Sequence, residues 1–243
     1  LNIMLMSPHS EDLAQLICEE KVSLVTTGAG NPAKYIPIWK EKGIKVIPVV
    51  PSVALAKRME RSGADALVVE GMEAGGHIGG ITTMCLVPQI VDAVNIPVIA
   101  AGGIADGRTA VAAFMLGADA IQAGTIFLVS DECGIHENYK NLVLKAKDTD
   151  SAVTGFYTGH PVRSIRNKFT KNLMTKEKEG IDSEDFEMLT IGFLKKAVID
   201  GNLDEGSFMA GQIAGLIKKT DSCENIITNL FSDIEDVYKG FVE

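Results

Sequence analysis

The sequence predicts an α/β protein built from parallel strands, and three observations support this fold class. Six short runs are nearly continuous in Val, Ile, Leu and Ala, which is typical of parallel strands that are buried on both faces. Helical patterns lie between most of these runs. The tetrapeptide Gly-Ala-Asp-Ala occurs at 63–66 and again at 117–120, each time between a helix end and a strand start. The chain therefore repeats a strand–loop–helix–loop–strand unit.

Each expected element rests on a local signal. The predicted strands are the apolar runs 1–5, 22–27, 45–50, 66–69, 97–101 and 120–128. The predicted helices are 10–20, 52–61, 87–93, 108–116, 210–218 and 224–239. Ser10 can cap the first helix, while Gly63 and Gly117 follow the second and the fourth as stop signals.

Six parallel strands joined by crossover helices form either an open doubly wound sheet or a closed barrel. A (β/α)8 TIM barrel has eight strands in roughly 250 residues. Because the chain opens on Leu1, without Met, in what resembles a strand end, we expect strands three to eight of a barrel whose first two βα units are absent. The alternative is a complete open sheet. We expect the barrel in 1–130, a small mostly helical insertion domain in 131–205, and C-terminal helices packed back on the barrel in 206–243.

Composition excludes several classes of protein. Of the 243 residues, 46% are hydrophobic and 23% are charged, which argues against disorder. The formal net charge of -9 argues against binding to nucleic acid, and no apolar run approaches the ~20 residues that span a membrane. The four cysteines lack paired spacing, so they predict no metal site and are typical of reduced thiols in a cytoplasmic protein.

Two glycine-containing turns predict a phosphate site. Gly102-Gly103 follows the fifth predicted strand and Gly124-Thr125 interrupts the last, which are barrel strands seven and eight in this interpretation. Phosphates often bind there, because glycine lets the backbone approach the anion and N–H groups at a helix start attract it. Thr125 adds a hydroxyl donor. Alternatively, these glycines only make tight turns.

The segment 70–80 has five glycines in eleven residues, so we expect neither a helix nor a strand there. His77, with a pair of glycines on each side of it in this loop, could approach a ligand and donate a proton or a hydrogen bond, or be a loop histidine without a role. Glu70 ends the preceding strand, where it could bind a polar cofactor ring or form a rim salt bridge. Asn2, expected at the end of its strand, is a polar contact or a plain cap. His160 lies in a turn that either faces the site or joins helices.

Seven segments carry a resemblance to a known family. They are 2–5, 26–30, 73–77 (Glu-Ala-Gly-Gly-His), 101–107, 122–125, 159–163 (Gly-His-Pro-Val-Arg) and 209–215. In these segments the chain resembles the FMN-dependent enoyl-acyl-carrier-protein reductase II family of bacterial fatty-acid synthesis. That family belongs to the wider group of nitronate monooxygenase (2-nitropropane dioxygenase) barrels.

The resemblance implies that the chain binds FMN, which NADH or NADPH reduces before hydride passes to a trans-2-enoyl thioester on acyl carrier protein. It implies His77 as the catalytic residue, together with a homodimer and sensitivity to a monovalent cation. The implied cofactor contacts are Gly102, Gly103, Gly124 and Thr125 for the phosphate, and Asn2, Glu70, Gly75, Gly76, Gln122 and Ala123 for the ring and ribityl chain. The weaker candidates for a substrate channel are Met209, Gln212 and His160.

Two other functions stay open. A nitronate monooxygenase on the same scaffold would use O2 and employ His77 as a base, so this residue does not discriminate between the two reactions. A barrel that binds a phosphate ligand without redox chemistry is the third possibility. Because two βα units are expected to be missing from the flavin site, we also expect the 243-residue chain to bind FMN poorly.

Overall fold

The computed structural model describes the backbone of residues 1–242 and the side chains of residues 1–240. Its contacts divide the chain into two compact units. The first unit comprises 1–72, 79–101 and 113–122. The second comprises 73–78, 102–112 and the chain from 123 onward.

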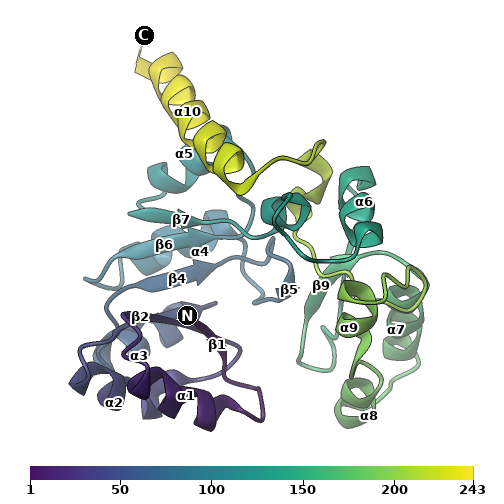
Figure 1. Cartoon of the computed structure of the whole chain (residues 1–243), viewed down its shortest axis with the longest axis horizontal. Coiled ribbons are helices and arrows are strands. Elements are labelled where there is room, and N and C mark those ends of the chain that lie inside the picture. The colour runs from purple at the N-terminus through teal and green to yellow at the C-terminus, as the bar shows by residue number, and fades with distance from the viewer. Residues whose placement is uncertain (243) are drawn as a thin grey trace. The chain divides into compact units, whose positions relative to one another are not determined.

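The first unit is a six-stranded sheet covered by helices. All neighbouring strands pair in parallel in the order β1-β2-β3-β4-β6-β7. The strands are β1 (Asn2–Met4), β2 (Leu24–Gly28), β3 (Lys45–Val50), β4 (Leu67–Glu70), β6 (Val98–Ala101) and β7 (Ala120–Gln122). The helices are α1 (Ser10–Glu19), η1 (Pro32–Lys34), α2 (Ile36–Glu41), α3 (Val53–Arg61) and α4 (Thr83–Val91), with α5 (Gly107–Met115) contributing to both units. In Figure 1, β4, β6 and β7 lie side by side with α4 beside them.

The repeated Gly-Ala-Asp-Ala segments perform the same structural task twice. Gly63 and Gly117 adopt left-handed φ values of 97° and 96°, which L-residues with side chains rarely adopt. Asp65 then accepts a hydrogen bond from the Val46 backbone N–H at 2.8 Å, and Asp119 accepts one from Val98 at 2.9 Å. Each aspartate thereby ties the start of its own strand to the preceding parallel strand.

Strand β4 is buried as a continuous apolar run should be. Leu67, Val68 and Val69 are all buried, which confirms that β4 is covered on both faces. The buried Trp39 on α2 donates its indole N–H to the Ala14 carbonyl at 3.1 Å, which joins α2 to α1.

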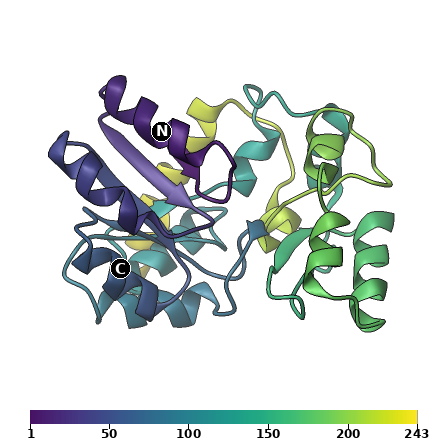
Figure 2. The same cartoon turned by 90° about the horizontal axis from the view of Figure 1, so that it is seen from below.

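The second unit is built around a small antiparallel sheet of order β5-β9-β8. Its strands are β5 (Gly76–His77), β8 (Ser151–Thr154) and β9 (Val162–Ile165). Its helices are η2 (Thr125–Val129), α6 (Glu137–Lys145), α7 (Lys168–Lys178), α8 (Ser183–Met188), α9 (Phe193–Val198), η3 (Gln212–Leu216) and α10 (Cys223–Val242). Figures 1 and 2 show α7, α8 and α9 lying together, and Phe169 stacks on Phe193 to join α7 to α9.

Three expectations were wrong in detail. The strand expected at 120–128 ends at Gln122, and the 3-10 helix η2 follows Gly124. The helix expected at 210–218 is only η3, because Gly211 and Gly215 weaken helical propensity and Gly215 packs against the backbone of 147–148. The glycine-rich loop contains β5, because long-range pairing with β9 supplies strand contacts that local composition does not show. The mostly helical interval 131–205 also contains β8 and β9 beside its helices.

Candidate active site

The carboxyl ends of three strands place two predicted ligand-binding residues in one row. Glu70 on β4 pairs with Ala101 on β6, and Ala101 pairs with Gln122 on β7. Glu70 and Gln122 are therefore two strands apart, at about 4.8 Å per strand. A carboxyl group and a carboxamide in one row can contact a single planar ligand. Glu70 ends its strand as the sequence indicated, whereas Gln122 ends a strand that was expected to continue to 128.

Glu70 is unusual among the acidic residues of the first unit. Loss of water through burial raises the pKa of its carboxyl to about 7. At neutral pH the group therefore exists in both protonation states, so it can donate a hydrogen bond as well as accept one. Such a carboxyl suits a ring that carries both donors and acceptors.

Asn2 is placed differently from the prediction. It opens β1 instead of ending it, and its Oδ1 accepts a hydrogen bond from the Thr26 hydroxyl at 2.8 Å. Both residues are at the surface of the first unit, and Asn2 pairs with Thr26 in the strand register. The amide nitrogen of Asn2 is a further donor there.

The predicted catalytic residue and the weaker channel candidates gather around β5 in the second unit. One side of β5 pairs with β9, with Gly76 opposite Arg163 and His77 opposite Val162. The other contacts come from residues 207–212, which we call the crossing segment. A Cβ built on Gly75 would lie 2.6 Å from the carbonyl carbon of Ala210, so only glycine fits there without a shift.

The crossing segment brings two of the three weaker channel candidates to this loop. The Met209 sulfur lies 3.5 Å from the position that a Cβ on Gly76 would occupy. The Gln212 N–H donates to the Glu73 carbonyl at 2.9 Å. Tyr139, on α6, donates its hydroxyl to the Met209 carbonyl at 2.6 Å. Met209 and Gln212 are thus neighbours of the glycine-histidine loop, although Gln212 makes this contact through its backbone.

His77 is exposed, yet protein surrounds enough of its ring to change its acidity. Burial lowers the pKa of His77, and the charge of His160 lowers it further. His160 itself is held by Glu187 on α8, with 3.0 Å between Nε2 and Oε1. The Ile78 N–H donates to the Pro161 carbonyl at 3.1 Å, so the turn that carries His160 lies beside the loop that carries His77.

Arg163 lies buried on β9 opposite Gly76, with only 4% of its surface exposed. Its Nη1 donates to the Ser151 hydroxyl on β8 at 3.0 Å. Burial lowers the pKa of Arg163, while the charge of Glu73 opposes this change. Arg163 and Glu73 therefore interact electrostatically as opposite charges at the loop that carries His77.

The two predicted phosphate-binding turns differ in the hydrogen-bond donors that they offer to a ligand. The start of α5 is already capped, because the Asp106 carboxylate accepts from the Thr109 N–H at 3.0 Å and pairs with Arg108. Burial alone would raise the pKa of Asp106, but these hydrogen bonds outweigh it and lower the pKa. The α5 terminus is thus satisfied by a carboxylate, and a phosphate would have to use the glycine backbone before it.

That glycine backbone fits an anion. Gly102 and Gly103 both adopt left-handed φ values, of 90° and 80°. A Cβ on Gly124 would meet nothing within 4 Å, so there is open space beside it. The Thr125 hydroxyl accepts from the Gly211 N–H at 2.9 Å and still has its own proton to donate. Backbone N–H groups and a hydroxyl are the donor set that a phosphate requires.

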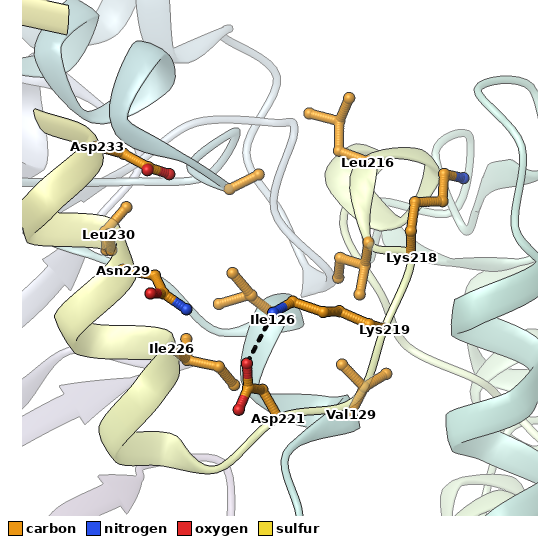
Figure 3. A pocket seen from close by; sticks show the side chains of 12 residues that line it. Ile126, Val129, Leu216, Lys218, Lys219, Asp221, Ile226, Asn229, Leu230 and Asp233 are labelled. Carbon is orange, nitrogen blue, oxygen red and sulfur yellow. Dashed lines mark hydrogen bonds and ion pairs between the residues drawn. The ribbon is translucent and has the colours of Figure 1, made fainter. Parts of the chain in front are cut away.

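A separate cavity of about 170 Å³ lies within the second unit, between η2, η3 and α10 (Figure 3). Its wall combines apolar side chains such as Ile126 and Leu230 with the Lys219–Asp221 ion pair. Because ligand sites for drug-sized molecules usually occupy about 300–1,000 Å³, this cavity alone is too small for a flavin nucleotide.

Three supporting residues were not predicted from the sequence. Glu187, Tyr139 and the buried Arg163 each act through a partner that is distant in the chain. Among the described residues, no group of His, Cys, Asp and Glu is arranged to hold a metal ion. Through residue 242, no helix combines the length and the apolar character that crossing a membrane requires.

Comparison with known proteins gives one family match. A family model described as nitronate monooxygenase matches residues 2–233. A curated relative from Staphylococcus saprophyticus, named probable nitronate monooxygenase, is 38% identical over 89% of this chain and 65% of its own length. A relative of the same name from Staphylococcus aureus is 36% identical over 91% of this chain and 65% of its length. The chain therefore spans slightly less than two thirds of these relatives.

Solved structures are also similar. FabK from Thermotoga maritima has 48% identity and a TM-score of 0.95, covering 99% of this chain and 76% of that one. A nitroalkane oxidase from Streptomyces ansochromogenes has 26% identity and a TM-score of 0.83, covering 95% and 69%. The α/β fold with its parallel sheet matches these TIM-barrel neighbours, which confirms the predicted fold class.

Proposed function

Because this chain belongs to the nitronate monooxygenase family, we propose that it acts within that family as a flavin-dependent reductase of trans-2-enoyl thioesters. The observation that carries this choice is the 48% identity to FabK over 99% of the chain, against 38% over 89% for a relative named nitronate monooxygenase. FabK is an enoyl-acyl-carrier-protein reductase II, the family that the sequence motifs resemble.

FMN is the cofactor in this proposal, since the nitronate monooxygenase and FabK families are FMN enzymes. When bound, FMN would supply the hydride equivalents that it receives from NADH or NADPH. The phosphate would be held by the glycine backbone at 102–103 and 124 and by the Thr125 hydroxyl, whose donor chemistry fits it. Glu70 and Gln122 would contact the ring from one row of strand ends, with Asn2, Gly75, Gly76 and Ala123 as further contacts.

His77 would act on the thioester. Because its pKa is lowered, His77 is mainly a neutral imidazole at neutral pH, with one N–H donor and one lone pair. The N–H can bind the thioester carbonyl oxygen, which becomes more negative as an enolate forms, and such donors stabilise developing charge. Met209 would line the path of the acyl chain beside Gly76.

Partners and location follow from the same proposal. The substrate would be presented by an acyl carrier protein, so we expect the enzyme in the cytoplasm, without a nucleic-acid or membrane partner. A homodimer and a dependence on a monovalent cation, which the resemblance implies, complete the proposal.

The second candidate is nitronate oxidation with O2. The family name favours it, and so does the neutral imidazole of His77, because a neutral histidine can remove a proton from a substrate. The two candidates require the same fold and the same flavin contacts, and they differ in substrate and in the use of oxygen.

A pair of steady-state assays separates them. In the absence of oxygen, we expect the FMN-loaded protein to consume NADH or NADPH when an enoyl thioester of pantetheine is added, and His77→Gln to reduce that rate by at least about 100-fold. His9→Gln, at an exposed histidine of the first unit, is the matched control and should keep the rate. Oxygen consumption with an alkyl nitronate, without thioester turnover, would reject the reductase. FMN-loaded protein that turns over neither the thioester nor the nitronate would reject both candidates.

A further inference from the structure

The Thr125 hydroxyl connects two parts of the second unit. Thr125 opens η2 directly after Gly124, at the turn proposed to hold the cofactor phosphate. Its hydroxyl accepts a hydrogen bond from the Gly211 N–H at 2.9 Å, across 86 positions of the chain, so this bond joins the phosphate turn to the crossing segment. Because a hydroxyl has one proton and two lone pairs, Thr125 can hold Gly211 and donate to an anion at the same time.

The crossing segment is in turn tied to the loop that carries His77. The Gln212 N–H, one residue after Gly211, donates to the Glu73 carbonyl at 2.9 Å. A Cβ built on Gly211 would lie 2.7 Å from the same carbonyl oxygen, so only glycine fits there without a shift. Because these contacts join backbone atoms, no side chain can rotate to absorb a movement. A shift of Gly211 therefore moves the glycine-histidine loop as well.

The first residues of the crossing segment are anchored independently, on α6. The Met209 carbonyl accepts from the Tyr139 hydroxyl at 2.6 Å, and the Tyr139 ring packs edge-on against Phe208 with 4.9 Å between ring centroids. Neither contact involves the phosphate turns. Of the contacts that fix the segment, the hydrogen bond to Thr125 is the one that a ligand bound at Gly124 and Thr125 can change directly.

We propose that Thr125 is a positioning residue that couples occupation of the phosphate turn to the placement of the crossing segment and, through it, of the glycine-histidine loop. This inference rests on the proposed function, because it takes the bound group to be the phosphate of FMN. When the Thr125 hydroxyl donates to a phosphate oxygen, its own oxygen becomes a stronger acceptor for the Gly211 N–H, since linked hydrogen bonds polarise one another. Binding would thereby fix the segment beside Gly76 and His77 before a substrate arrives.

The other phosphate turn touches the same loop in a different way. A Cβ on Gly103 would lie 3.6 Å from the Glu73 Cβ, which is an ordinary contact distance, and Gly103 itself has no side chain there. At the start of α5, the Asp106 carboxylate is engaged by the Thr109 N–H at 3.0 Å. Thr125 is therefore the side chain that we expect to transmit binding at these turns, and a substitution at this position tests that role.

The test is hydrogen–deuterium exchange of the whole chain, with and without FMN, read by mass spectrometry in peptides that cover the crossing segment. Coupling between two sites usually amounts to about fivefold or more, so we expect FMN to slow exchange of this segment at least about fivefold in the wild type. Thr125→Val keeps a branched side chain but has no hydroxyl, and FMN should no longer slow the segment. Thr125→Ser restores the hydroxyl and should restore the slowing. Peptides from α7 are the internal control and should not change.

Riboflavin provides a measurement on the unchanged protein, which decides the matter even if Thr125→Val does not fold or does not bind FMN. Riboflavin has the ring and the ribityl chain of FMN without the phosphate. At equal occupancy, followed by quenching of flavin fluorescence, we expect FMN to slow the segment and riboflavin not to slow it.

Three results would overturn the inference: equal slowing by FMN and riboflavin, equal slowing in the wild type and Thr125→Val, or no slowing by FMN at any concentration. Because the readout is exchange and not turnover, each of these results would remove the coupling alone. The proposed reaction is judged separately, by thioester turnover of the FMN-loaded protein.

Discussion

Gly75→Ala tests how tightly the glycine-histidine loop packs against the crossing segment. The added Cβ would lie 2.6 Å from the Ala210 carbonyl carbon and 2.7 Å from the Gly211 nitrogen, whereas ordinary contacts are 3.4–4 Å. Because both neighbours are backbone atoms, no side-chain rotation relieves the overlap, and the loop or the segment must move. Overpacking of this kind typically costs about 1–3 kcal/mol.

The assay is thermal unfolding followed by circular dichroism. For a chain of this size each kcal/mol lowers Tm by about 2–4 °C, so we expect a decrease of roughly 2–12 °C. Gly80→Ala is the matched control on the same loop, since its Cβ would meet nothing within 4 Å, and its Tm should stay within about 2 °C of the wild type. Equal Tm values for the two variants would refute the packing that we describe.

Two further predictions concern buried polar groups. Because the folded-state pKa of Glu70, about 7, lies above its ordinary value of 4.5, the folded state binds the proton more tightly, and stability should fall by on the order of 3 kcal/mol as pH rises from about 4.5 to about 7. Glu70→Gln should abolish that part of the pH dependence in urea unfolding, and an unaltered pH profile would contradict the burial of Glu70. Burial raises the pKa of Tyr139, so its hydroxyl stays protonated and donates to the Met209 carbonyl throughout the ordinary pH range. Tyr139→Phe should lower the free energy of unfolding by about 1–3 kcal/mol in the same assay, and no loss would mean that this hydrogen bond does not form.

Much of the first unit could be predicted because its signals are local. Continuous apolar runs located the six parallel strands, and the repeated Gly-Ala-Asp-Ala marked two equivalent helix-to-strand connections. Asp65 and Asp119 then proved to make the same backbone contact in each repeat. Glu70 could be identified because it ends a predicted parallel strand, whereas Gln122 was named only through the family resemblance.

The second unit was less predictable because its contacts join residues that are far apart in the chain. The strand β5 has only two residues and owes its existence to pairing with β9. Arg163 and Ser164 are buried on β9, so that strand lacks the apolar pattern by which strands are recognised. The contacts of Tyr139 with Met209 and of Glu187 with His160 have no local sequence signal at all.

The C-terminal segment shows a second reason why sequence patterns were insufficient. The helices of the 206–243 segment were expected to pack back on the barrel, and Met209 and Gln212 were weaker candidates for a substrate channel; the first residues of the segment form the crossing segment beside the glycine-histidine loop. Gly75 and Gly211 allow this close approach because neither has a side chain. Glycines whose role depends on a distant backbone cannot be distinguished in the sequence from glycines that only make turns.

The most direct test of the proposed reaction is a single turnover in the absence of oxygen. The protein, loaded with FMN, would be reduced with one equivalent of NADPH or NADH and mixed with crotonyl-pantetheine while the flavin absorbance is recorded. We predict rapid reoxidation of the flavin, slowed by at least about 100-fold in His77→Gln. A reduced flavin that persists with the thioester, but is reoxidised when oxygen is admitted and then supports turnover of an alkyl nitronate, would contradict the reductase and assign the protein to nitronate oxidation.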